Sequence, residues 1–147
     1  MKIYLAHPFL EQELGLKVQA QLEALGITVM NPFQRNEQPI YEAIIAKKEL
    51  FGPKHAKNIV EGDLRLIERA DAIIALVTGK ASIGTHMEVF YCSRILQKPV
   101  FCLYQLGGAT GKIHPWYEFL TKSYSTETEL LTAIKNYTKP IFDPTGV

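Results

Sequence analysis

The sequence predicts an α/β fold in which a doubly wound, parallel, five-stranded sheet is flanked by helices. Two observations support this prediction. Short, wholly apolar runs recur along the chain, as is typical of strands that are covered on both faces. Between them lie segments whose apolar residues recur at spacings of three and four, the period of an amphipathic helix. Their alternation predicts right-handed βαβ units and a flavodoxin-like or Rossmann-like sheet.

The first part of the chain predicts two strands with a helix between them. KIYLA (Lys2–Ala6) is a short apolar run suited to a buried strand, and ITVM (Ile27–Met30) predicts a second. The intervening segment places leucine and valine on one helical face, and Gly26 is well placed to end the helix. The inward-facing residues of this helix are Leu10, Leu14, Val18, Leu22 and Leu25. Between Asn31 and Pro53 we expect a loop and then a short helix near Ile40–Leu50.

The middle of the chain predicts a helix, the central strand and a second helix. We expect the first helix over Lys54–Ala70, with Ala56, Ile59, Val60, Leu64 and Ile67 facing inward. DAIIALV (Asp71–Val77) is fully apolar after its first residue, which predicts a central strand of a parallel sheet. The loop TGKASIG then leads to a helix that contains Glu88 and ends before Pro99.

The last part of the chain predicts two more strands and a closing helix. PVFCLY (Pro99–Tyr104) is the fourth strand, and a short fifth strand is expected near 121–124. Thr126-x-x-Glu129 has the spacing of a capping box, which predicts the start of the last helix. Its buried residues are expected to be Leu130, Ile134 and Tyr137.

Composition narrows the classes of protein and partner. The chain has 147 residues, enough to bury a core, and is most simply one domain over 1–147. Hydrophobic residues make up 47% and charged residues 21%, which are ordinary values for a globular protein. Sixteen Lys and Arg stand against fifteen Asp and Glu, with no basic stripe or acidic tail. We therefore expect no nucleic acid and no membrane surface as a partner.

The chain's start and its cysteines predict its compartment. MKIYLAHPF lacks the features of a secretory signal, and no apolar run reaches the ~20 residues that span a bilayer. Cys92 and Cys102 lie in apolar stretches without a CxxC pattern or neighbouring histidines. This favours buried free thiols over a disulfide or a metal site. We expect a cytoplasmic protein that uses no metal and no other cofactor.

The predicted architecture places the functional site at one edge of the sheet, because ligands of open α/β sheets bind outside the carboxyl ends of the strands. The loops at that edge contain AHPF, NPFQ, TGKASIGTHME and QLGGATGK. Glu88 is the last residue of the third of these segments, in a run too apolar for an unpaired carboxylate. We expect it in the first turn of its helix, where unpaired N–H groups and the helix dipole would keep a shielded carboxylate ionised and nucleophilic.

Asp63 is a second acid in an apolar setting. It lies four residues after Ile59 and four before Ile67, near the apolar side of its predicted helix. Burial beside an ionised Glu88 favours a protonated Asp63 carboxyl. Displacement at an anomeric carbon needs such a pair, one carboxylate to attack and one acid within roughly 8 Å to carry the leaving group's proton. Two simpler interpretations stay open: Asp63 pairs with a neighbouring Lys or Arg, or Glu88 serves only the helix dipole.

Three segments, in order and at their separations, carry a family resemblance. KIYLAHPF contains Tyr4 in the opening strand. NIVEGDLRLIERADAIIAL places Asp63 eight residues before the strand residue Asp71, to which we assign a structural role. SIGTHMEVFY, followed by KPVFCLY, contains Glu88 before the next strand. Together these segments cover most of the chain and resemble the nucleoside 2-deoxyribosyltransferase family.

The resemblance implies a mechanism and its residues. Glu88 would attack C1′ of the deoxyribose and hold it as a covalent glycosyl-enzyme, Asp63 would handle the nucleobase proton, and Tyr4 would position the nucleophile. The substrates would be 2′-deoxynucleosides and free purine or pyrimidine bases, exchanged with retention and with slow hydrolysis as a side reaction. The resemblance also implies a homo-oligomer of dimeric units, as a hexamer, in which HPWYEF or the C-terminal tail approaches a neighbouring cleft.

Five further residues would bind substrate on the same basis. Phe9 would stack on the base and Gln34 would hydrogen-bond to it. Ser82 and Gly84, in the loop before Glu88, would meet the sugar. His114, in GKIHPWY, would act across the subunit boundary.

Two alternatives remain. Transferases of this family can carry an acidic residue at the position of Ser82. A serine there resembles the related hydrolases of 2′-deoxynucleoside 5′-monophosphates instead. Such a hydrolase needs a phosphate cradle, whereas LAHPFLEQ has no glycine and Pro8 lacks an N–H. We therefore favour nucleosides as substrates. The third interpretation is a non-catalytic nucleotide-sensing module, which would not require Asp63 and Glu88 together.

Overall fold

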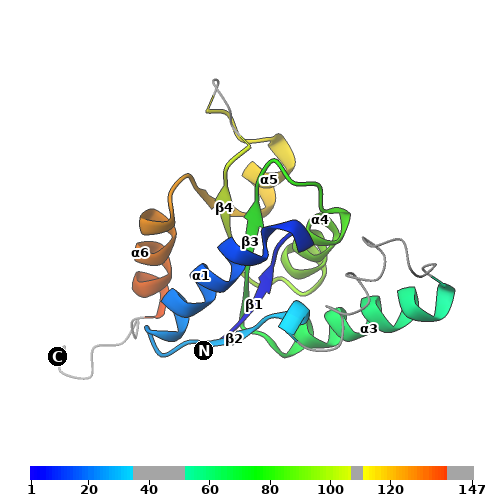
Figure 1. Cartoon of the computed structure of the whole chain (residues 1–147). Coiled ribbons are helices and arrows are strands. Elements are labelled where there is room, and N and C mark those ends of the chain that lie inside the picture. Colours follow the sequence, from blue (N-terminus) through cyan, green and yellow to red (C-terminus); the bar gives the residue numbers. More distant parts are fainter. Residues whose placement is uncertain (35–51, 107–110, 139–147) are drawn as a thin grey trace.

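The computed structural model describes residues 1–34, 52–106 and 111–138 (Figure 1). Strands and helices alternate along this part of the chain, as predicted. They are β1 (Lys2–Ala6), α1 (Gln12–Glu23), β2 (Thr28–Met30), α3 (Pro53–Arg69), β3 (Ala72–Val77), α4 (Ile83–Phe90), β4 (Val100–Tyr104), α5 (Pro115–Leu120), β5 (Lys122–Tyr124) and α6 (Glu127–Thr138). Three short segments complete them: η1 (Phe9–Glu11), η2 (Pro32–Gln34) and the π-helical η3 (Tyr91–Ile95). The predicted helix near Ile40–Leu50 lies outside the described residues.

The five strands form one parallel sheet in the order β2-β1-β3-β4-β5. This is the flavodoxin-like order of a doubly wound sheet, so the predicted fold class is confirmed. In the register of β1, Tyr4 lies beside Met30 of β2 on one side and Ile73 of β3 on the other. Asp71 has the structural role assigned to it, because its carboxylate accepts a hydrogen bond from the backbone N–H of Lys2 at 2.7 Å.

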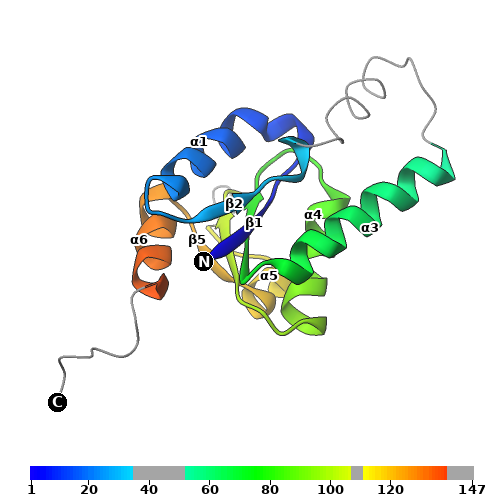
Figure 2. The ribbon, with the colours of Figure 1, turned by 90° about the horizontal axis from the view of Figure 1, so that it is seen from below.

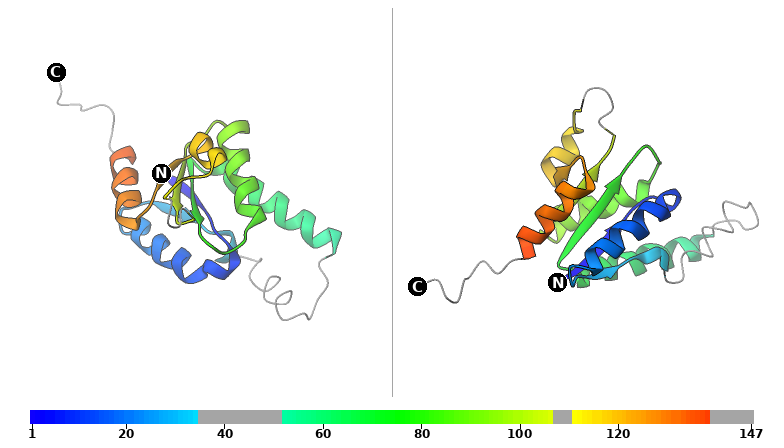
Figure 3. Two further views of the ribbon diagram at one scale, coloured as in Figure 1. Left: turned by 90° about the horizontal axis from the view of Figure 1, so that it is seen from above. Right: turned by 60° about the vertical axis from the view of Figure 1, so that its left-hand side comes forward.

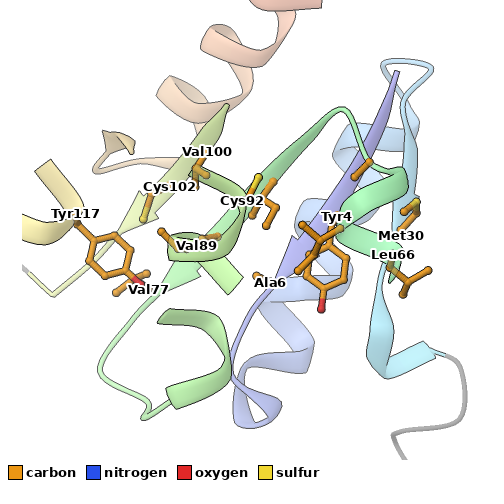
Figure 4. Packing of buried hydrophobic residues seen from close by; sticks show 14 of the residues in the cluster. Tyr4, Ala6, Met30, Leu66, Val77, Val89, Cys92, Val100, Cys102 and Tyr117 are labelled. Carbon is orange, nitrogen blue, oxygen red and sulfur yellow. The ribbon is translucent and has the colours of Figure 1, made fainter. Parts of the chain in front are cut away.

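Helices cover both faces of the sheet (Figures 2 and 3). We call one the α1/α6 face. Its buried cluster is aliphatic apart from one phenylalanine: Ile3, Leu5, Val18, Leu22, Ile27, Ala72, Ile74, Leu76, Phe101, Leu103, Leu130 and Ile134. The other is the α3/α4 face, which α5 also covers. Its cluster contains tyrosines and both cysteines, as well as aliphatic residues such as Leu66, Ile67 and Val89 (Figure 4).

Several predicted helix faces differ at their ends. Leu10 and Leu25 are exposed because α1 spans only Gln12–Glu23, so both fall beyond it. Val60 is 55% exposed because the N-terminal half of α3 extends past the sheet (Figure 2). Tyr137 is also exposed, whereas Leu130 and Ile134 are fully buried as predicted.

The helix α5 was not predicted, because it is short and only Tyr117 among its residues is buried. The capping expectation for α6 holds, since Thr126 Oγ1 accepts a hydrogen bond from the Glu129 N–H at 3.2 Å. Both cysteines are buried free thiols. Within the described ranges, the structure contains no helix long and apolar enough to cross a membrane.

Candidate functional site

The candidate site begins with a hydrogen bond between a strand and a helix. Tyr4 lies in the middle of β1, and the pleat directs its side chain into the α3/α4 face (Figure 4). Its ring is fully buried, and its phenol donates a hydrogen bond to Glu88 Oε2 on α4. The strand therefore fixes where the Glu88 carboxyl group lies.

Asp63 approaches the same carboxyl group from α3. The next turn of α3 packs Leu66 and Ile67 into the core of this face, which holds the helix beside β1. Oδ1 of Asp63 is buried from solvent, and the Asp63 carboxylate acts electrostatically on Glu88. The structure thus brings together all three residues to which the sequence assigned catalytic roles.

The pKa of Glu88 shows how unfavourable its ionisation is in this place. Burial of the carboxyl group raises the pKa to about 8, and the nearby negative charge of Asp63 raises it in the same direction. The hydrogen bond from Tyr4 acts in the opposite direction, because a donor stabilises the carboxylate. Glu88 is therefore protonated in the free protein at neutral pH.

The position of Glu88 in its helix differs from the expected one. The first turn of α4 contains no acidic residue, and Glu88 is the sixth residue after the Ser82 N-cap. Five residues of helix place it about 8 Å below the start of α4, beyond the range where N-terminal N–H groups stabilise a charge. The helix dipole therefore does not keep Glu88 ionised. Its position one turn deeper is what allows it to meet Tyr4 in the middle of β1.

Gly84 and Ser82 lie before Glu88 at the start of α4. A Cβ atom at Gly84 would be 3.9 Å from Glu88 Oε1, so the backbone of Gly84 borders the carboxyl group with no side chain between them. Ser82 caps the helix: its Oγ accepts a hydrogen bond from the Thr85 N–H at 3.2 Å and lies 2.6 Å from Thr85 Oγ1. The Ser82 hydroxyl is therefore already engaged in the free protein.

Phe9 and Gln34 lie at the carboxyl-end rim of β1 and β2. The Phe9 ring packs edge-on against Phe33, with the ring centroids 5.7 Å apart. Gln34 Oε1 accepts a hydrogen bond from Gln19 Nε2 at 2.9 Å, and Gln19 also accepts one from Asn31. Amide contacts thus hold Gln34 toward α1 in the free protein.

His114 lies on the far side of α4 from Tyr4. It is the N-cap of α5, where its Nδ1 accepts a hydrogen bond from the Trp116 N–H at 3.3 Å. It also lines a cavity of about 580 Å³ between α4 and α5, which contains further aromatic and apolar side chains: Phe90, Tyr104, Trp116 and Tyr117 among them. Figure 4 shows Tyr117 and Tyr4 at opposite ends of the buried cluster. Within one chain, His114 therefore does not join the Glu88 group.

A small cavity that the sequence did not predict lies at the start of α4. Its volume is about 180 Å³, and Lys80, Ser82 and Thr85 are among the residues that line it. Thr78, which also lines it, donates a hydrogen bond to Glu11 at 3.1 Å and so links this loop to η1. The signal in the sequence is TGKASIGT, in which a lysine and hydroxyl residues precede a helix N-terminus.

We found no group of three or more His, Cys, Asp or Glu side chains placed to hold a metal ion among the residues described. The chemistry that these residues support directly is that of two carboxyl groups and a phenol. Such a set can attack a carbon centre and transfer a proton.

Comparisons with known proteins bear on the family and the fold of the chain. A family model described as nucleoside 2-deoxyribosyltransferase matches residues 3–129. A 2-deoxyribosyltransferase from Bacillus psychrosaccharolyticus has a similar structure, with 24% identity and a TM-score of 0.66 over 89% of this chain and 90% of that one. A conserved protein from Enterococcus faecalis has 19% identity and a TM-score of 0.65, over 93% and 98% of the two chains.

A third similar structure is a CMP N-glycosidase from Clostridium botulinum, with 21% identity and a TM-score of 0.57 over 93% and 99% of the two chains. At these identities the structural matches show the fold alone. A comparison with curated protein sequences gave no match.

Proposed function

The chain belongs to the nucleoside 2-deoxyribosyltransferase family, and we propose that it transfers 2-deoxyribose between nucleobases through a covalent ester at Glu88. The observation that carries this proposal is the convergence of Tyr4, Asp63 and Glu88 on one face of the sheet. Two carboxyl groups that interact electrostatically, one of them hydrogen-bonded to a fixed phenol, provide a nucleophile and a proton donor at a single carbon.

In the first half-reaction a Glu88 oxygen forms a bond to C1′ while the N-glycosidic bond breaks. The bonding pair leaves with the base nitrogen, and Asp63 supplies the proton that the base takes up. In the second half-reaction an incoming base attacks C1′ on the face that the first base left, and it gives its proton to Asp63. The ester bond between C1′ and Glu88 breaks, and its electron pair returns to the Glu88 carboxylate. The two displacements return the original configuration at C1′.

The raised pKa of Glu88 sets a condition on this sequence of steps. Attack requires the carboxylate, whereas the free protein holds a proton on Glu88 below about pH 8. The proton must therefore leave Glu88 before the ester forms, and the pair needs one proton and one negative charge in total. Tyr4 favours the ionised form of Glu88 through its hydrogen bond. We assign Tyr4 to positioning and ionising the nucleophile.

The remaining site residues bind substrate in this proposal. Gly84 leaves room for the sugar beside the Glu88 carboxyl group, and Ser82 stands at the start of the same helix. Phe9 offers a ring for stacking on the base at the rim. Gln34 can donate its amide N–H groups to a base while its Oε1 accepts the hydrogen bond from Gln19.

A second candidate reaction is hydrolysis of a 2′-deoxynucleoside 5′-monophosphate through the same ester. The cavity at the start of α4 supports it, because Lys80 and hydroxyl groups beside a helix N-terminus suit a phosphate. Pro8 also lines that cavity and contributes no N–H, which favours nucleosides instead. Transfer between nucleosides therefore stands first.

We also propose a homo-oligomer of dimeric units, assembled as a hexamer. Large apolar side chains are exposed on α4 and α5, with Met87 at 66%, Trp116 at 59% and Phe119 at 75%. Single exposed apolar residues are common on protein surfaces, whereas several that lie together favour a contact with another protein. On this basis His114, which lies on that side, reaches a neighbouring site. A monomer in sedimentation with full activity would contradict this assembly.

The test of function is incubation with deoxyinosine, thymidine and deoxycytidine, each with and without a second free base, and with the corresponding 5′-monophosphates. Transfer predicts a new deoxynucleoside in the presence of the acceptor base, with suppressed hydrolysis. Release of base from monophosphates alone would favour the hydrolase. No cleavage of any of these compounds would favour a nucleotide-sensing module.

A further inference from the structure

Lys98 lies between η3 and β4 and contacts the C-terminal end of α3. Its Nζ donates hydrogen bonds to the backbone oxygens of Glu68 at 2.6 Å, Ala70 at 2.8 Å and Ile67 at 3.3 Å. These carbonyls belong to the last turn of α3 and to its C-cap residue Ala70, where a helix runs out of backbone N–H donors. A cation at this position also opposes the negative end of the helix dipole.

Tyr91 makes a second contact with the C-terminal end of α3, from the end of α4. It is the first residue of η3, directly after α4, and its phenol donates a hydrogen bond to Glu68 Oε1 at 2.8 Å. Glu68 is thus held through its side chain by Tyr91 and through its backbone by Lys98.

The backbone after α4 is shaped to make these contacts. The chain leaves α4 through a π-helical turn, in which the Leu96 N–H bonds to the Tyr91 oxygen at 3.0 Å. Gln97 then adopts a left-handed conformation with φ of 53°, which turns the chain back. The Lys98 N–H bonds to the Cys92 oxygen at 2.9 Å, so Lys98 is held at its backbone as well as at its amine.

Within the described part of the chain, few other buried side chains fix the orientation of α3. Only Ile59, Leu66 and Ile67 of this 17-residue helix are buried, and its N-terminal half extends beyond the sheet (Figure 2). Asp63 lies at the middle of α3, about 8 Å along the helix from Glu68, and Glu88 is less than one turn from Tyr91. A small tilt of α3 at its C-terminal end would therefore change the separation of the two carboxyl groups.

We propose that Lys98, Tyr91 and Glu68 form a clamp that positions Asp63 relative to Glu88 for proton transfer to the leaving base. This inference rests on the proposed function. The three clamp residues are positioning residues, because they act through Asp63 and do not touch the reacting atoms. A simpler role, capping of α3 for stability alone, makes different predictions that the following variants separate.

The informative variants are Lys98→Met, which keeps the side-chain length without the charge, and Tyr91→Phe, which removes one hydroxyl. Lys98→Arg is the conservative rescue. Lys57→Met is the matched control, because Lys57 forms an exposed ion pair with Glu61 on the same helix, away from the clamp. We expect kcat to fall about tenfold in Lys98→Met with KM nearly unchanged, because misplacement affects the transition state. The kcat of Tyr91→Phe should also fall, whereas the kcat of Lys57→Met should not.

Two further measurements exclude a purely structural role. If the clamp acts through Asp63, Lys98→Met should not lower kcat further when it is added to Asp63→Asn. A similar loss in both backgrounds would overturn the proposal. The second measurement is the titration of the Glu88 carboxyl by carbon-13 NMR without substrate. Tyr4 and Asp63 act on this group, so a displaced Asp63 should lower the Glu88 midpoint.

The titration keeps the test independent of the proposed function. If no deoxynucleoside is cleaved, the kinetic comparison is lost but the Glu88 midpoint still reports the position of Asp63. An unchanged midpoint in folded Lys98→Met and in Tyr91→Phe would overturn the clamp, whatever the enzyme's substrate. A lowered midpoint in both, restored in Lys98→Arg, would support it.

Discussion

The two faces of the sheet are built from the same strands but differ in chemistry. On β1, Ile3 and Leu5 point into the α1/α6 face, whereas Tyr4 and Ala6 point into the α3/α4 face. The first face is almost wholly aliphatic and is sealed by two helices. The second face contains a phenol bonded to a carboxyl group whose pKa is raised to about 8.

The difference shows how the fold separates stability from chemistry. Burial of apolar side chains stabilises the fold and carries no desolvation penalty for a polar or charged group. A carboxyl group beside another carboxylate opposes folding when it ionises. The parallel sheet accommodates both because the pleat alternates side chains between its faces. Variants on the two faces should therefore change different measured quantities.

The largest effect is expected for Glu88→Ala. Both transfer and hydrolysis begin with attack by Glu88, so both should fall by a factor on the order of 10⁴. The measurement is a single-turnover reaction of the wild type without acceptor base. It should release base in a burst and leave a protein heavier by one deoxyribosyl group, mapped to the peptide that contains Glu88. Base exchange by Glu88→Ala, with no label in the wild type, would contradict the mechanism.

The opposite result is expected on the α1/α6 face. Leu22 is fully buried there, and Leu22→Ala should lower the free energy of unfolding by about 2–5 kcal/mol. Because Leu22 does not approach Glu88, kcat per folded molecule should stay at the wild-type value. Denaturant unfolding and active-site titration measure the two quantities separately. A large loss of kcat in the folded fraction would show that the faces are coupled.

The same contrast decides what could be predicted from the sequence. Strands such as Ala72–Val77 are apolar throughout, so their position and central place follow from local pattern. Glu88 and Asp63 were conspicuous because charged residues are rare in apolar runs. The predicted position of Glu88 within its helix was wrong because α4 starts at the Ser82 cap, two residues earlier than the loop pattern suggested.

Other features depend on contacts that local patterns do not encode. The bond from Tyr4 to Glu88 joins residues 84 positions apart, and only the sheet order brings them together. The engagement of Gln34 by Gln19 and the place of His114 beyond α4 are likewise set by packing. The short α5 has little apolar pattern of its own, because much of its surface is exposed.

A smaller effect than that of Glu88→Ala is expected for Asp63→Asn. Proton donation contributes about 10²-fold, so kcat should fall by roughly that factor with bases that need protonation and by less with better leaving bases. Removal of the Asp63 charge should also lower the pKa of Glu88 from about 8. The pH profile of kcat/KM measures both. An equal loss for every base would argue against Asp63 as the acid.

Tyr4→Phe should move the same pKa in the other direction. The phenol stabilises the ionised Glu88, so its removal should raise the pKa above the wild-type value of about 8. At neutral pH less of the nucleophile would be ionised, and kcat/KM should fall about tenfold. The loss should shrink as the pH rises. A pH-independent loss would indicate that Tyr4 acts through packing alone.

The smallest expected effect concerns stability. Glu88→Gln removes the ionisation but keeps an acceptor for Tyr4. The folded-state pKa of Glu88 is raised to about 8 from an ordinary value of 4.5. Between these values the native protein binds a proton that the unfolded chain has lost, so the free energy of unfolding falls as the pH rises through this window and levels off above it.

In the Glu88→Gln variant this fall in the free energy of unfolding is absent. Glu88→Gln should therefore gain stability over the wild type progressively from pH 4.5 to pH 8. Denaturant unfolding at several pH values measures the gain, and Leu22→Ala, which involves no titratable group, should show a constant loss instead. If Glu88→Gln gave no gain at pH 8, the carboxyl group would not oppose folding, and the contrast between the two faces would not extend to stability.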